Sequence, residues 1–168
     1  MKLIQSRDNP FYKHLKRLAE SGRERRKTGQ TLLDGVHLVE AYEAGLGPVD
    51  TLIVGESAQA GGEITRFIAG REVVVLADTL LRALGLVDTP SGLLAVAAMP
   101  KPNSTVNLKK DAILLDAVQD PGNVGTLLRT AAAAGIRHAL LGPGCSSAWS
   151  PKVLRAGQGS HFALTIHE

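Results

Sequence analysis

The chain has 168 residues, of which 44% are hydrophobic and only 4% aromatic, a composition that suits a globular α/β protein with one or two cores and disfavours a β-sandwich packed around rings. Cys145 is the single cysteine, which excludes an intrachain disulfide and a cysteine-based zinc cluster and indicates the reducing cytoplasm as the location. The net charge is +3, and no apolar run approaches the roughly 18 residues of a membrane span, so we expect a soluble protein with no membrane partner.

The charges are unevenly distributed along the chain. Residues 1–30 contain nine Lys and Arg against three Asp and Glu, residues 31–100 contain three against nine, and residues 101–168 contain seven against four. This separation predicts one basic and one acidic surface, and the basic one is a candidate for binding phosphate groups. A solvated helix face would give the same pattern, and charge alone leaves both explanations open.

A helix is predicted over residues 11–20, where apolar residues recur at helical spacing behind an Asn9-Pro10 start signal. Glycines at positions 22 and 29 border the basic segment that follows, which we expect to be mobile. The basic residues of the helix and of this segment are candidate phosphate contacts: Lys13, Lys16, Arg17, Arg23, Arg25 and Arg26.

Strands and short helices alternate over the rest of the first hundred residues. Apolar and β-branched runs predict strands over residues 31–33, 51–54, 73–76 and 93–98, and helical spacing predicts helices over residues 36–44, 63–68 and 79–84. The alternation predicts a compact three-layer α/β domain over residues 1–100. The polar, proline-containing residues 101–110 are typical of an interdomain linker.

A parallel-sheet unit is predicted after the linker. Strands over residues 112–115 and 139–141 flank a helix over residues 123–134, which is the strand-loop-helix-strand order of a right-handed crossover. Ligands of such sheets bind beyond the carboxyl ends of the strands, where we expect residues 116–125 to lie.

Asn123 and Arg129 are the candidate site residues of this loop and helix. They lie six residues apart, so the amide and the guanidinium can reach one ligand, with Arg129 expected on the inward or rim side. The alternative is that Asn123 caps the helix, Gly125 allows close packing and Arg129 is a surface charge. The sequence has no dinucleotide or P-loop glycine motif and no metal-spaced His or Cys cluster, so we expect no metal.

The residues around Asn123 match a known pattern. Asp120-Pro-x-Asn123-x-Gly125-x-x-x-Arg129-Thr-Ala131 is similar to the first signature motif of the SpoU/TrmH family of knotted (SPOUT) RNA methyltransferases. Several residues in fixed register make this motif specific, and the similarity extends over nearly the whole chain.

Two further segments carry the resemblance. Ser150-Pro-Lys-Val-Leu-Arg155-Ala-Gly157 is similar to the family's segment in which a helix start faces the active site, with glycine where most relatives have serine. The pattern Ile-x-Ser-x-x-Asn-Pro near the start of the chain and the Asp34-Gly35 pair, where relatives usually have Glu-Gly, resemble the substrate-binding domain that precedes many of these methylases.

The resemblance implies a ribosomal-protein-like RNA substrate-binding domain over residues 1–100 and the first part of a parallel-sheet SPOUT methylase domain over residues 111–168. The family transfers a methyl group from S-adenosylmethionine to a ribose 2′-hydroxyl of ribosomal or transfer RNA. The implied cofactor is therefore S-adenosylmethionine, and the implied partner is structured RNA.

The same resemblance implies roles for single residues. Asn123 and Arg129 are the implied catalytic residues, and Lys152 and Arg155 are implied RNA contacts beside the basic residues near the start of the chain. The family holds the cofactor with two later motifs that are threaded into a knot and shared across a dimer, and neither matches this sequence. We therefore expect an incomplete methylase domain, inactive by itself, that forms a homodimer when complete.

Two other functions stay open. A non-catalytic RNA-binding module would hold structured RNA with the basic segment and the first domain, and it would bind RNA without a cofactor. An unrelated parallel-sheet enzyme would bind a nucleotide at residues 116–125. We expect Cys145 and Trp149, near a strand end, to be packed core.

Overall fold

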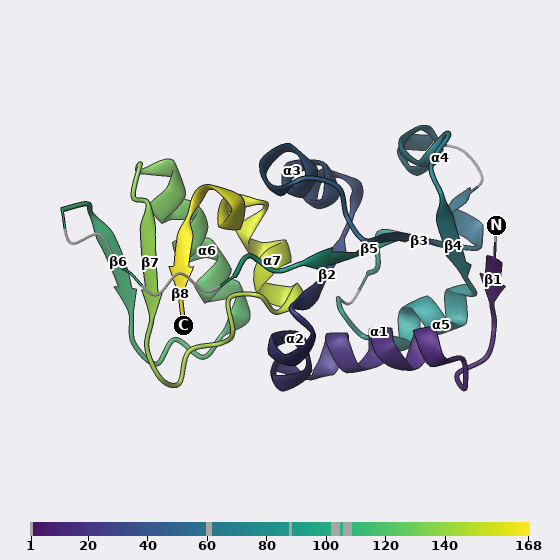
Figure 1. Cartoon of the computed structure of the whole chain (residues 1–168), viewed down its shortest axis with the longest axis horizontal. Helices are drawn as coiled ribbons and strands as arrows, with labels where there is room; N and C mark the ends of the chain where they lie inside the picture. The colour runs from purple at the N-terminus through teal and green to yellow at the C-terminus, as the bar shows by residue number, and fades with distance from the viewer. Residues whose placement is uncertain (1, 60–61, 88, 102–104, 106–108) are drawn as a thin grey trace.

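The computed structural model describes residues 2–59, 62–87, 89–101, 105 and 109–168, which form two β-sheets with helices packed against them (Figure 1). Sheet A is built from the first part of the chain, and sheet B follows residue 110. Six residues of the predicted linker, 102–104 and 106–108, lie outside the described residues. The boundaries of the two predicted domains and of the linker stay a prediction. No helix in the described ranges is both long and apolar enough to cross a bilayer.

Sheet A is mixed, with strand order β1-β4-β3-β5-β2. Strands β1, β4 and β3 run parallel to one another, and β5 is antiparallel to both β3 and β2. The strand bounds are β1 Lys2–Ile4, β2 Gln30–Asp34, β3 Thr51–Gly55, β4 Val73–Leu76 and β5 Leu93–Ala98. The four strands predicted from apolar runs are thus confirmed, whereas the three-residue β1 was not predicted.

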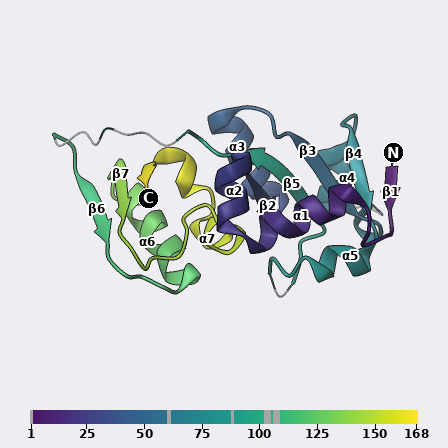
Figure 2. The ribbon, with the colours of Figure 1, turned by 60° about the horizontal axis from the view of Figure 1, so that its bottom comes forward.

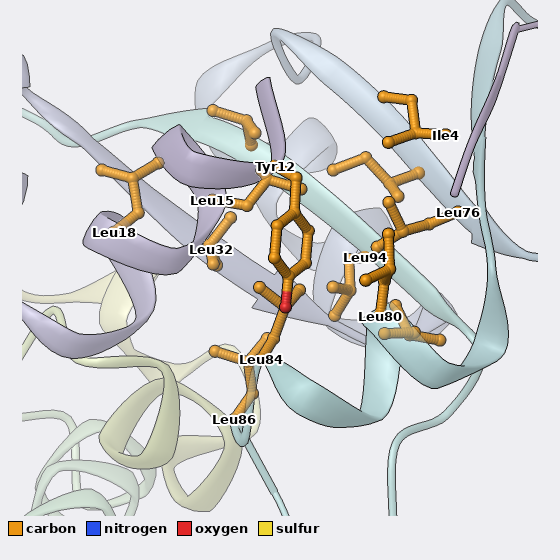
Figure 3. Close-up of a cluster of buried hydrophobic side chains, with 13 residues drawn as sticks. Ile4, Tyr12, Leu15, Leu18, Leu32, Leu76, Leu80, Leu84, Leu86 and Leu94 are labelled. Carbon is orange, nitrogen blue, oxygen red and sulfur yellow. The ribbon is translucent and has the colours of Figure 1, made fainter. Parts of the chain in front are cut away.

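One face of sheet A is covered by α1 Pro10–Glu20 and α5 Asp78–Ala83 (Figure 3). Helix α1 begins as predicted, because the Asn9 side chain accepts hydrogen bonds from the backbone N–H groups of Phe11 and Tyr12. Leu15 and Leu18 are fully buried against this face, and each such burial stabilises the fold by roughly 1.5–3 kcal/mol.

The opposite face is covered by α3 Val36–Leu46 and α4 Gly62–Ile68. Successive strand residues point to opposite faces, so Leu32 contacts the α1 side whereas Leu33 contacts the α3 side. Strand β5 lies inside the sheet and buries five of its six residues, because both of its faces are covered. The predicted three-layer arrangement is confirmed.

The basic segment after α1 is a helix, α2 Gly22–Thr28, and the expectation of a mobile segment is wrong. The Ser21 hydroxyl accepts a hydrogen bond from the backbone N–H of Glu24, and Gly29 ends the helix in the left-handed conformation. Arg25 anchors the helix, because its guanidinium donates to the carbonyl oxygen of Leu18 at 2.7 Å.

Sheet B consists of three parallel strands in the order β6-β7-β8. The strands are β6 Ala112–Leu115, β7 His138–Leu141 and β8 Thr165–His167, and the helices are α6 Pro121–Ala133 and α7 Pro151–Gly157, followed by the 3-10 turn η2 Ser160–Ala163. Helices α6 and α7 pack on one face, whereas Leu114 on the other face is 71% exposed.

Helix α7 joins the two sheets by packing against β2 (Figure 2). Leu154 is fully buried in the core between sheet A and α3, although it belongs to α7. The Thr31 hydroxyl donates to the carbonyl oxygen of Trp149 at 2.7 Å, and Phe162 meets Tyr42 edge-to-face with ring centres 5.4 Å apart. These contacts fix sheet B relative to sheet A.

Gly125→Ala should destabilise the chain by about 1–3 kcal/mol, because a Cβ atom at Gly125 would lie 2.4 Å from the Cβ of Ala156 and force α6 and α7 apart. Urea denaturation followed by circular dichroism measures this change. Thr126→Ala, on the exposed side of the same helix, is the matched control and should change stability by less than about 0.5 kcal/mol. Equal stability of the Gly125→Ala and Thr126→Ala proteins would contradict the close packing.

Candidate active site

The candidate site lies where β6 and β7 end, and two loops are tied together there. Gly142, after β7, donates its backbone N–H to the carbonyl oxygen of Leu115 at 2.8 Å. The backbone N–H of Ser146 donates to the carbonyl oxygen of Val118 at 2.9 Å. The Cys145 thiol donates to Leu115 and accepts from the backbone N–H of Val118, both at 3.4 Å. Cys145 therefore holds the two loops in place.

Helix α6 begins at this edge of sheet B. The Asp120 carboxylate accepts a hydrogen bond from the backbone N–H of Asn123 at 2.8 Å, and Pro121 occupies the first turn. The alternative in which Asn123 caps the helix is wrong, because Asp120 does so. The Asn123 side chain is exposed and makes no hydrogen bond to any described residue, so its amide is available to a ligand.

Arg129 lies almost two turns further along α6. It is exposed rather than inward-facing, since the buried side of the helix consists of Val124, Gly125, Leu128 and Ala131. Asn123, Thr126 and Arg129 follow one another at three-residue spacing on the exposed side, and Asn123 and Arg129 are about 9 Å apart along the axis. The long Arg129 side chain can span part of this separation, so one nucleotide can contact both residues.

The basic residues of α1 and α2 fall into two groups. The guanidinium or ammonium groups of Lys13, Arg17, Arg23 and Arg26 are exposed. Lys16 is half-buried and donates to the carbonyl oxygen of Ala83 at 2.7 Å. Arg25 is only 6% exposed, and burial lowers the pKa of its guanidinium below the usual value. Arg25 is therefore a structural residue of the α1–α2 junction.

Lys152 and Arg155, both on α7, differ in whether their charged group is free or already paired within the chain. Lys152 is exposed in the first turn and has no ion-pair partner among the described residues. Arg155 forms an ion pair with Asp34, whose side chain is 1% exposed and also accepts a hydrogen bond from the Ser91 hydroxyl at 2.7 Å. Arg155 therefore connects α7 to the end of β2 and does not offer a free charge to RNA in this arrangement.

His161 explains the glycine at position 157. The ring of His161 is buried, and a Cβ atom on Gly157 would lie 2.7 Å from its Nδ1, which leaves no room for the serine usual in the family. The Nε2–H of His161 donates to the carbonyl oxygen of Ala148 at 2.8 Å, and the ring of Trp149 packs edge-to-face against the His161 ring. Burial lowers the pKa of His161 to about 4. The sequence alone gave His161 no role.

The loops at the ends of β6 and β7 hydrogen-bond to each other. A cavity of about 680 Å³ is lined by residues of α2, Trp149 and the β8 region, and not by residues 116–125. Among the described residues, no three His, Cys, Asp or Glu side chains are grouped as metal ligands.

The fold and the motif residues resemble those of SpoU-type RNA methyltransferases. The model of the SpoU rRNA methylase family matches residues 111–168, and the model of the MRM3-like substrate binding domain matches residues 9–95. The chain therefore belongs to the proteins with an MRM3-like substrate binding domain, and its residues 111–168 match the SpoU methylase family, which confirms the resemblance seen in the sequence.

Individual relatives match either nearly the whole chain or about half of it. It is 36% identical over 166 residues to the 23S rRNA (guanosine(2553)-2′-O)-methyltransferase RlmP of Bacillus subtilis, covering 99% of this chain and 64% of RlmP. It is 44% identical over 85 residues to the mitochondrial rRNA methyltransferase 3 of Homo sapiens, covering 46% of this chain and 20% of that protein. The chain thus spans less than two thirds of the length of these relatives.

Solved structures agree with the fold. The crystal structure of an RNA 2′-O ribose methyltransferase superposes with a TM-score of 0.78 at 31% identity, covering 98% of this chain and 64% of that one. The S-adenosylmethionine-bound rRNA methyltransferase from Sinorhizobium meliloti superposes with a TM-score of 0.77 at 26% identity, covering 99% and 64%.

Acid should destabilise the chain in part through His161. Its pKa is about 4 in the folded state against an ordinary value of 6.5, so above pH 6.5 the ring is neutral in both states. As the pH falls from 6.5 to 4, only the unfolded state takes up the proton, and stability drops by about 1.4 kcal/mol per pH unit. Urea denaturation of the unchanged protein and of His161→Leu over this range should show a shallower pH dependence in the variant. Equal slopes would contradict the neutral buried ring.

Proposed function

We propose that this chain is the RNA-binding and motif-bearing part of an enzyme that transfers a methyl group from S-adenosylmethionine to a ribose 2′-hydroxyl of ribosomal or transfer RNA. The observation that carries this proposal is the pair Asn123 and Arg129 on the exposed side of α6. The Asp120 cap leaves the Asn123 amide unused, and Arg129 has no ion-pair partner among the described residues. Two unpaired polar side chains on one helix face are suited to an extended polar ligand such as an RNA strand.

Arg129 acts as a clamp in this proposal. A guanidinium has a pKa above about 12, so it is a poor general base at neutral pH. It donates parallel N–H bonds to a phosphate and to the 2′-oxygen, and it stabilises the negative charge that develops there when the hydroxyl loses its proton. The Asn123 amide positions the same nucleotide. We infer the methyl donor from similarity, since the structure of the Sinorhizobium meliloti rRNA methyltransferase contains bound S-adenosylmethionine.

The proposed RNA surface is the exposed basic side of α1 and α2 together with Lys152. Its α1 and α2 residues belong to the substrate-binding domain, proposed as residues 1–100, and Lys152 belongs to the methylase part, proposed as residues 111–168. We also propose a cytoplasmic location and a homodimeric complete enzyme, as the family resemblance implies. The cations of this surface are Lys13, Arg17, Arg23, Arg26 and Lys152.

Arg129→Ala, introduced into the gene in the cells that carry it, should abolish one ribose methylation in their RNA. We expect the methylated fraction at that nucleotide to fall at least about a hundredfold, because a charge-stabilising contact to the reacting group is lost. Mass spectrometry of nuclease-digested ribosomal and transfer RNA measures it. Arg66→Ala, which removes an exposed arginine of α4, is the matched control and should leave methylation unchanged. An unaltered methylation pattern in Arg129→Ala cells would contradict the proposal.

A non-catalytic RNA-binding module is the second candidate function, and the separate basic face of α1 and α2 favours it. Arg23→Ala should weaken binding of a fluorescently labelled RNA hairpin and lower the slope of log K against log salt by about 1, if Arg23 contacts one phosphate. Fluorescence anisotropy at several salt concentrations measures both changes, with Arg66→Ala as the control. An identical slope for Arg23→Ala and the unchanged chain would remove α2 from the RNA surface.

A further inference from the structure

A small cavity lies between the α1–α2 junction and the starts of α6 and α7. We call this cavity the junction notch. Its volume is about 250 Å³, and water occupies roughly 30 Å³ per molecule in the liquid, so it has room for a small anion with part of its hydration. The residues that carry the argument are Glu20 and Arg25 on one side and Ser147, Ser150 and Lys152 on the other.

Arg25 brings a buried cation with unused donor capacity to the notch. The residue is 6% exposed, and its Nη1 donates to the carbonyl oxygens of Leu18 and Ala19 at 2.7 and 3.4 Å. Its buried Nε–H has no acceptor among the described residues. A buried donor without an acceptor costs about 1–3 kcal/mol. The Nε–H itself is closed off from solvent, so the guanidinium favours an anion in the notch through its positive charge.

The opposite wall adds donors. Lys152 contributes an exposed ammonium group without an ion-pair partner among the described residues. The Ser150 oxygen accepts the backbone N–H of Val153, which leaves its O–H free to donate, and the Ser147 hydroxyl is bound to no described residue. Two cations and two hydroxyl groups from separate elements thus face one cavity.

The single carboxylate of the wall is already neutralised. Glu20 forms an ion pair with Lys16 at 2.9 Å, four residues earlier on α1. Its repulsion of an entering anion is therefore reduced, and the balance of Arg25, Lys152 and Glu20 remains positive.

We propose that the junction notch binds one phosphodiester group of the RNA backbone. This inference rests on the proposed function, because RNA is the anion that the exposed basic side of α1 and α2 would bring there. Pro121 at the start of α6 also lines the notch, so a phosphate bound there places the neighbouring nucleotide beside Asn123. The notch sets the position of the strand relative to the motif, and it depends on both sheets.

The test is a titration of the ¹⁵N-labelled chain with diuridine monophosphate (UpU), which has a single phosphodiester. We expect saturable shifts of the Ser147 and Lys152 amide signals and of the Arg25 Nε–H signal in ¹H–¹⁵N spectra. Lys152→Ala should weaken this binding about tenfold, because one charge-assisted hydrogen bond is lost. Arg66→Ala is the matched control and should bind UpU as the unchanged chain does. Ser147→Ala is a second variant that removes one neutral donor, with a smaller loss expected.

A parallel titration with inorganic phosphate distinguishes a site for the RNA backbone from a site for free phosphate. Weaker binding of inorganic phosphate than of UpU supports an RNA backbone site, whereas equal or tighter binding overturns that assignment. If UpU shifts none of these signals, the proposal that the junction notch binds a phosphodiester is overturned. If Arg129→Ala still abolishes one ribose methylation, the proposed function stands without the notch. If methylation is also unaltered in Arg129→Ala cells, both the proposed function and the notch are overturned.

Discussion

The buried carboxylate of Asp34 holds the two sheets together. It ends β2, its side chain is 1% exposed, and it accepts hydrogen bonds from the hydroxyl and backbone N–H of Ser91 and an ion pair from Arg155 of α7. A buried charge is tolerated only with such partners, and loss of the Arg155 guanidinium would leave the Asp34 carboxylate buried without its counter-ion. The ion pair and the burial of Leu154 in the core of sheet A fix α7 against β2. The start of α7 is thereby held beside the junction of α1 and α2.

The packing of α7 against β2 determines which basic side chains are accessible to RNA. Counting charges treats Arg25 and Arg155 like any other basic residue. Arg155 pairs with Asp34, whereas Arg25 anchors α2 and reaches RNA only through the junction notch that it lines. The exposed cations that we propose for the RNA surface lie on α1, α2 and the first turn of α7, and Lys152 among them lines the notch. The α1–α2 junction and the starts of α6 and α7 line this one cavity, so the notch connects the substrate-binding part to the start of the motif helix.

Much of the fold could be predicted from periodicity, because long amphipathic helices and apolar strands carry strong local signals. β1 and β8 were missed, since three residues are too few to show alternation. α2 was missed because its seven residues have no apolar stripe, and its stability depends on Arg25 reaching Leu18. The motif located the candidate site, but the roles of Asn123 and Arg129 remain predictions. Pairing between distant residues, such as Asp34 with Arg155, has no signal in a single sequence.

The most direct test of the account is photochemical crosslinking of the chain to structured ribosomal RNA, with the crosslinked peptides identified by mass spectrometry. The account predicts crosslinks in peptides from α1 and α2, from the start of α6 around Asn123, and from the start of α7 around Lys152. These peptides surround the junction notch and lie on both sheets. Crosslinks confined to α3 and α4, on the opposite side of sheet A, would contradict a single RNA surface that spans the two sheets.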